Sequence, residues 1–268
     1  MDHDVVSRLE EGGLLWRAEG HPRSIHQPRR EGVPPFGITA IDTALPGGGF
    51  APGTIHDWLV APDATHLPCL LPATIAANTL RHDDAHGRGA RVIVWIGAAV
   101  RPAPWLLHRL FVRAGEATDA LIRRCLFVDP GRGKNHLWAI EAALRSPAVA
   151  AVVSDVRTLS LIASRRLALA ARQSGAIGLI ISHPTARAQR GREHGSAAAT
   201  AWRCTPVPSE DLEPWWRLEL LRCKGTPPRH TTWIVAHRDE EQTDPLHIPA
   251  VVGDRSRVSA PAAERRYG

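Results

Sequence analysis

Residues 53–70 read GTIHDWLVAPDATHLPCL, which has the outline of a strand, a phosphate-binding loop and a helix. Such a loop, G-x-x-x-x-G-K-[ST], needs glycines for close backbone approach, a lysine for the β- and γ-phosphates and a hydroxyl for Mg²⁺. If Ala61 aligns with the first glycine, the other three positions hold His66, Leu67 and Pro68. Pro68 also lacks a backbone N–H to offer a phosphate. The sequence therefore predicts a degenerate loop and no bound cofactor.

A longer pattern precedes this loop. Residues 36–59 read FGITAIDTALPGGGFAPGTIHDWL, which resembles the T-G-x-x-x-L-D-x-x-L-G-G-G-hydrophobic-x-x-G run that leads into the nucleotide-binding strand of RecA recombinases. The matching positions are Thr39, Ile41, Asp42, Leu45, Gly47, Gly48, Gly49, Phe50, Gly53 and Ile55. In length and pattern the chain resembles the ImuA family, RecA-like and SulA-related accessory proteins of bacterial SOS mutagenesis. The resemblance is specific over residues 36–59 and follows the order of elements as far as Ala236.

The same resemblance bears on ATP hydrolysis. In the RecA pattern a catalytic glutamate follows the second strand, and here that position falls in Gly97–Val100, which contains no acid. Ser154 stands where the pattern has its Mg²⁺-binding aspartate, and Asp155 comes one position later. A shift of one residue along a strand moves a side chain to the opposite face of the sheet. We therefore expect a pseudo-ATPase. An ATPase whose nucleotide loop lies elsewhere is an alternative, with Lys134 in GRGKN as its lysine.

Strand-like and helical runs alternate along the chain, as is typical of parallel βαβ units. We expect strands at 54–60, 91–97, 125–128, 148–153 and 176–182, and helices at 70–80, 104–115, 135–145 and 159–173. Alternating runs at 215–222 and 231–236 predict an antiparallel hairpin. The expected fold is α/β, a RecA-like, doubly wound, mostly parallel sheet flanked by helices, with the antiparallel hairpin at its edge.

The predicted organisation has three regions. Residues 1–35 would form an N-terminal arm of helical turns and a Pro/Arg-rich linker, 36–238 the RecA-like core, and 239–268 a poorly ordered tail. The chain has 268 residues, of which 44% are apolar, enough for one core. No run of apolar residues is long enough to span a membrane, and no secretory signal is evident, so we expect a cytoplasmic protein without a membrane partner.

Several smaller groups of residues predict structure more than chemistry. The four cysteines lie far apart without a C-x-x-C pair, which favours reduced thiols over disulfides or a metal site. Residues 82–86, HDDAH, place two histidines beside carboxylates, but they are interpreted as a surface loop before the next strand. Trp95, Trp138 and Trp233 have apolar neighbours, so we expect them to be buried or half-buried.

Two segments carry candidate binding residues. The polar run 184–200 contains Arg187, Arg190 and Arg192. The RecA resemblance places a DNA-contacting loop there, whereas the residues alone also fit a solvated surface loop. In the N-terminal arm, Leu9 and Trp16 either dock on a neighbouring protein, as the resemblance implies, or pack on their own domain.

The resemblance implies a function in binding. The expected protein is a non-catalytic accessory or scaffold of a damage-induced translesion synthesis complex. The implied partners are an ImuB-type inactive homologue of Y-family polymerases, an error-prone replicative-type DNA polymerase, and the RecA filament; direct contact with DNA is left open, and the net charge of +6 is compatible with it. The alternative is a cell-division inhibitor like SulA, which has a RecA-like core without the phosphate loop.

Overall fold

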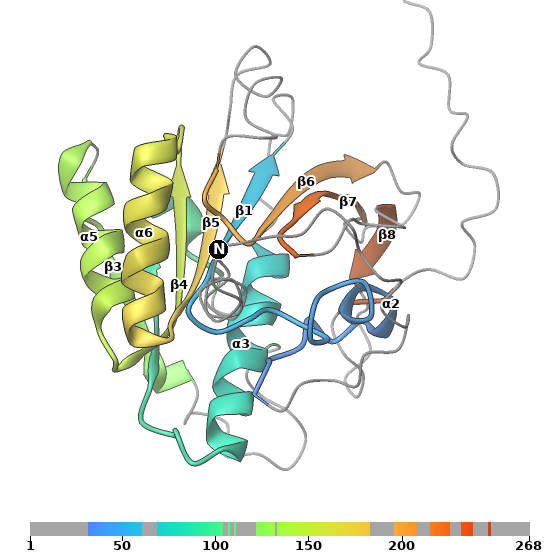
Figure 1. Cartoon of the computed structure of the whole chain (residues 1–268), viewed down its shortest axis with the longest axis horizontal. Helices are drawn as coiled ribbons and strands as arrows, with labels where there is room; N and C mark the ends of the chain where they lie inside the picture. The colour runs from blue at the N-terminus through green and yellow to red at the C-terminus, as the bar shows by residue number, and fades with distance from the viewer. Residues whose placement is uncertain are drawn as a thin grey trace, which may run out of the picture.

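In the part of the chain that the structure describes, the strands form one sheet of nine, drawn in Figure 1. The computed structural model describes residues 32–60, 69–103, 107, 110, 122–131, 133–182, 196–207, 215–225, 232–237 and 246–247. The strands are β1 (Ile55–Val60), β2 (Val92–Ile96), β3 (Cys125–Val128), β4 (Val149–Val156), β5 (Ile177–Ser182), β6 (Thr200–Val207), β7 (Trp215–Cys223), β8 (Thr232–His237) and β9 (Leu246–His247). Their order in the sheet is β3-β2-β4-β5-β1-β6-β7-β8-β9.

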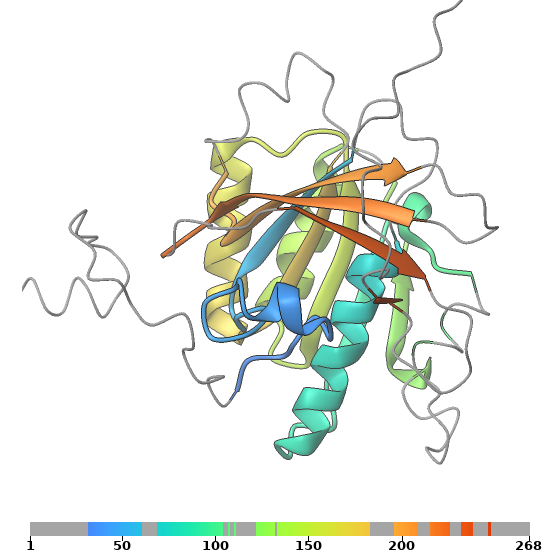
Figure 2. The ribbon, with the colours of Figure 1, turned by 90° about the vertical axis from the view of Figure 1, so that its right-hand side faces the viewer.

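Parallel and antiparallel pairing divide this sheet into two parts. The strands from β3 through β6 pair in parallel, whereas β6 with β7, β7 with β8 and β8 with β9 pair antiparallel. Figure 2 shows the antiparallel strands crossing the direction of the parallel ones, as the twist of a large sheet requires. The predicted α/β architecture with a mostly parallel sheet and an antiparallel edge is therefore confirmed.

Helices cover both faces of the parallel part (Figures 1 and 2). Helix α3 (Leu70–Ala85) packs on one face, and α5 (Lys134–Arg145) and α6 (Leu161–Ser174) lie side by side on the other. Each face has its own apolar cluster, which we call the α3-side and the α5/α6-side clusters. Ser160 caps α6 by accepting a hydrogen bond from the backbone of Ala163 (3.1 Å), and Gly175, with φ +76°, ends it.

The segment that resembles RecA serves the fold directly. It contains the short helix α2 (Thr39–Asp42), and the carboxylate of Asp42 accepts backbone hydrogen bonds from Phe36 (2.7 Å) and Gly37 (3.1 Å). A β-carbon on Gly49 would lie 2.2 Å from the carbonyl oxygen of Pro34, so this position requires glycine. These contacts bury Phe36, Ile41, Leu45 and Phe50 in the α3-side cluster. The motif thus has a structural role in this fold that does not depend on a bound nucleotide.

A buried histidine joins β1 to β6. His56 is 2% exposed, and its Nε2 and Nδ1 lie 2.9 Å from Thr54 Oγ1 and 2.8 Å from Thr200 Oγ1. Burial lowers its pKa to about 3, so the imidazole is neutral at physiological pH. Trp58 and Trp202 stack beside it with ring centroids 5.5 Å apart. This polar and aromatic packing fixes the centre of the sheet.

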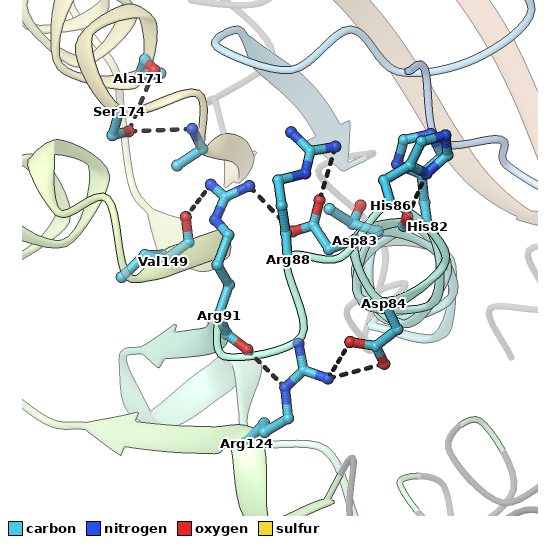
Figure 3. A network of polar contacts seen from close by, with 12 residues as sticks. His82, Asp83, Asp84, His86, Arg88, Arg91, Arg124, Val149, Ala171 and Ser174 are labelled. Carbon is cyan, nitrogen blue, oxygen red and sulfur yellow. Dashed lines mark hydrogen bonds and ion pairs between the residues drawn. The ribbon is translucent and has the colours of Figure 1, made fainter. Parts of the chain in front are cut away.

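Carboxylates and arginines bind the C-terminal end of α3 to the sheet (Figure 3). Asp83, 2% exposed, forms ion pairs with Arg88 (3.1 Å) and Arg91 (3.0 Å). Asp84 pairs with Arg124 at 2.7 Å, and Arg124 also donates to the carbonyl of Arg91. The prediction of a surface loop at residues 82–86 is therefore wrong. Helix α3 extends to Ala85 because arginines from the following loop and strands neutralise its last-turn acids.

The other expectations had different outcomes in the described structure. Trp95 and Trp233 are buried as predicted, but Trp138 on α5 is 69% exposed. Strand β6 was missed because its apolar alternation is interrupted by arginine and proline. The short β9 pairs with β8 inside the predicted C-terminal tail. The predicted helix at 104–115 lies almost wholly outside the described residues. None of the described helices is long and apolar enough to cross a membrane.

Candidate functional site

The C-terminal ends of β1, β2, β4 and β5 form the candidate site, since α/β proteins bind ligands at this edge of a parallel sheet. Helix α3 follows β1 and begins at this edge, which is where a phosphate loop would lie. The loop residues Ala61, His66, Leu67 and Pro68 fall outside the described residues. The described residues around the loop show which side chains the strands and helices bring to this edge.

Asp155 faces α3, the side from which a Mg²⁺–nucleotide would be reached. It is paired with Ile181 of β5, a member of the α3-side cluster. The register of β4 against β2 shifts between Val149 and Ala151, so that Ala150 is an extra residue. Such a bulge reverses the alternation of side chains beyond it. The displacement of the aspartate by one position is thereby compensated, and its carboxylate stays on the α3 side.

The environment of this carboxylate is tight. A β-carbon on Gly97 would lie 2.1 Å from Asp155 Oδ1 and 3.0 Å from His136 Cε1. Gly97 has φ +111°, and its N–H donates to the carbonyl of Val128 (3.0 Å). Asp155 Oδ1 is buried, and none of the described residues gives it a hydrogen-bond partner. An unpaired buried carboxylate oxygen costs free energy, and a functional role is one of the explanations for such a group in a folded protein.

Ser154 points to the opposite face. Its hydroxyl donates to the carbonyl of Ile96 (2.8 Å) and lies 3.0 Å from His136 Nε2 on α5. Ser154 is fully buried. The residue at the position of the RecA aspartate is therefore occupied by contacts within the protein and does not face α3.

Cys69 stands at the first turn of α3, next to the described end of the loop. Its thiol donates to the carbonyl of Ala99 at 3.7 Å. Burial, and then the negative charge of Asp155, raise the pKa of Cys69 to about 11, so the thiol is protonated at neutral pH. Ala99 belongs to the 3-10 turn Ala98–Val100 after β2, where the RecA pattern has its glutamate, and Val100 is fully buried there.

On the α5/α6 side of this edge, a buried hydrogen bond joins Ser182 to Asp57. Ser182, the last residue of β5, donates to Asp57 Oδ1 at 2.6 Å, and both residues are almost fully buried. Ser182 is therefore held by Asp57 of β1. This hydrogen bond joins the last residue of β5 to the middle of β1.

The alternative nucleotide loop around Lys134 lies elsewhere. Lys134 is the first residue of α5 and is exposed, and the loop before it follows β3. In the sheet, β3 is separated from β1 by β2, β4 and β5. Within the described ranges, no group of three or more His, Cys, Asp or Glu residues is placed to hold a metal ion.

The remaining candidate residues are not brought together by the described structure. Arg187, Arg190 and Arg192 lie in 183–195, and Leu9 and Trp16 in 1–31, both outside the described ranges. Their proposed contacts with DNA and with partners remain predictions.

Sequence reasoning missed the roles of Cys69, His136 and Ser182 at this edge. A signal was available only for Ser182, because polar residues at the end of a buried strand often need a buried partner. The contacts of Cys69 and His136 depend on how α3 and α5 pack, which residue spacing does not reveal.

Comparisons with known proteins agree with this architecture. The crystal structure of the RadB recombinase superposes with a TM-score of 0.56 at 15% identity, covering 80% of this chain and 98% of that one, which shows a shared RecA-like fold. No family model matches the chain. Protein ImuA from each of two strains of Caulobacter vibrioides is 31% identical over 248 residues, covering 87% of this chain and 95% of the relative. The chain therefore belongs to the ImuA family.

Proposed function

We propose that the protein is a non-catalytic accessory component of a damage-induced translesion mutagenesis complex, and that it acts by binding other proteins. Membership of the ImuA family and the RecA-like fold support an accessory role in this system. The finer proposal, that the former nucleotide site does no chemistry, comes from the geometry of the sheet edge.

The observation that carries the proposal is the contact between the start of α3 and the turn after β2. Here the Cys69 thiol meets the Ala99 carbonyl, and the turn that would present a catalytic glutamate contains Ala98, Ala99 and Val100. Catalysis of phosphoryl transfer depends on positioning and on positive charge around the γ-phosphate. The described edge offers a neutral thiol, an apolar turn and the carboxylate of Asp155. None of these would position the γ-phosphate or place positive charge beside it.

The proposed partners are an ImuB-type inactive homologue of Y-family polymerases, an error-prone replicative-type polymerase and the RecA filament. A core without a nucleotide switch would hold one conformation, so its affinity for a partner should not depend on ATP. The three arginines Arg187, Arg190 and Arg192 are proposed to add a phosphate contact to DNA that weakens as salt is raised.

Binding to the ImuB-type homologue from the same genome tests this function. The purified full-length proteins are mixed in biolayer interferometry without nucleotide, with ADP and with ATP, each with Mg²⁺. We expect a saturable complex whose Kd is the same in all three conditions. Absence of a complex, or a Kd that changes severalfold with ATP, would contradict the proposal.

A further inference from the structure

Exposed apolar side chains gather at two places on the described surface. Leu126, Phe127 and Val128 lie along β3, at the edge of the sheet. The second group lies on α5 and α6 and consists of Trp138, Leu161, Ile162 and Leu169, which are 69%, 42%, 74% and 62% exposed. Large apolar side chains that are exposed together often mark an interaction surface.

The second group forms part of one surface, the outer face of α5 and α6, which lie side by side in Figure 1. Ile162 and Leu169 are seven residues apart on α6, so they project from the same side of the helix. The opposite side of α6 is buried through Ser164, Leu167 and Ala171. The exposed apolar residues are thus surplus to the packing of the helix on the sheet.

Charge on this face has one sign. The exposed basic residues are Lys134, Arg145, Arg165, Arg166 and Arg172, whereas the two helices contain a single acid, Glu141. Glu141 is buried and is shared by Arg145 (2.7 Å) and Arg166, whose side chains remain 60% and 65% exposed. The shared carboxylate links α5 to α6 and leaves the outer face strongly positive.

We propose that this outer face docks an acidic segment of a protein partner that also carries apolar side chains. The exposed apolar side chains of α5 and α6 would pack against the apolar side chains of the partner segment, and the arginines of this face would pair with the segment's carboxylates. The aliphatic Ile162 and Leu169 favour a protein over a nucleic acid, because the main attractions for nucleic acid are phosphate charge and base stacking on aromatic rings. The inference rests on the proposed function, since it names the surface through which the mutagenesis complex is held.

The test uses full-length protein, the ImuB-type homologue as probe, and two variants of the face. One variant combines Trp138→Ala with Ile162→Ser, and the other combines Arg165→Glu with Arg172→Glu. The comparison variants are Leu126→Ser, which lies in the separate exposed apolar group on β3 and is 49% exposed, and Arg157→Glu, an exposed arginine outside both helices; they show whether binding depends on the α5/α6 face in particular. All these positions are exposed, so circular dichroism should show unchanged folding.

We expect each double variant to weaken binding at least about tenfold, as loss of central contacts in an interface does, and the controls to bind like wild type. The charge variant should also lose the salt dependence of association. Wild-type binding that survives both double variants would overturn this inference while leaving the proposed function intact. Failure of the wild-type protein to bind would overturn both.

Two further measurements identify other occupants of the face. If the double variants lost binding to a fluorescein-labelled single-stranded oligonucleotide but still bound the partner, the face would be assigned to nucleic acid and the inference would be overturned. Concentration-dependent self-association in ultracentrifugation that disappears in the Trp138→Ala, Ile162→Ser variant, again with partner binding intact, would assign it to a second copy of the chain and overturn it as well.

Discussion

Replacing Gly97 by alanine should destabilise the protein through the carboxylate of Asp155. The backbone of Gly97 (φ +111°, ψ 151°) is one that only glycine adopts readily, and the strain on alanine there is roughly 1–3 kcal/mol. The added β-carbon would also lie 2.1 Å from Asp155 Oδ1, and relieving such an overlap costs about 1–3 kcal/mol. Gly97→Ala should therefore lower the free energy of unfolding by about 2–6 kcal/mol.

Two comparisons separate the overlap from the strain. Gly133 also has a positive φ (φ 87°, ψ −137°) but nothing within 4 Å of an added β-carbon, so Gly133→Ala should cost the backbone strain alone. Asp155→Ala removes the overlapping oxygen, so adding Gly97→Ala to it should cost about 1–3 kcal/mol less than in the wild type. Urea denaturation followed by tryptophan fluorescence measures all four variants. If Gly97→Ala costs no more than Gly133→Ala, or the same with and without Asp155, the described placement of the carboxylate is refuted.

Two further predictions concern the sheet and α3. The pKa of His56 is about 3 in the folded protein and 6.5 when unfolded, so its contribution to stability is complete above pH 6.5 and is lost as pH falls. Between pH 7.5 and 5.0 the wild type should lose about 2 kcal/mol more than His56→Gln; parallel unfolding curves for the two proteins would exclude this. Asp83→Ala breaks a buried pair with Arg91 and should cost about 3–5 kcal/mol, whereas Asp84→Ala, at a half-exposed pair, should cost about 1 kcal/mol or less by urea titration. If the two substitutions lowered the free energy of unfolding equally, the buried ion pair assigned to Asp83 would be contradicted.

The parallel strands of the sheet were predictable because strands buried on both faces are apolar runs rich in β-branched residues. Strands β2 and β5 are examples. The RecA-like motif was predictable for a related reason, since positions such as Asp42 and Gly49 have steric and hydrogen-bonding duties that few residues can meet. Local chemistry specifies these elements, and it is visible in the sequence.

What failed depended on distant partners. The last turn of α3 looked like a loop because its acids are polar, and the buried position of Asp83 is explained by its ion pairs with Arg88 and Arg91, which follow the helix. The face to which Asp155 points depends on the bulge at Ala150, which spacing along β4 alone does not show. Trp138 was expected to be buried or half-buried, but α5 buries the side that carries Ala139, Ile140 and Leu144 and leaves Trp138 exposed.

Nucleotide binding tests the central claim most directly. Isothermal titration of the full-length protein with ATP and Mg²⁺, beside a turnover assay, measures whether the edge around Cys69 and Asp155 still accepts a triphosphate. We predict no saturable heat up to millimolar ATP and no phosphate release above a protein-free control. Saturable binding at one site per chain would contradict the account, because the carboxylate and the neutral thiol would then have to be part of a working nucleotide site.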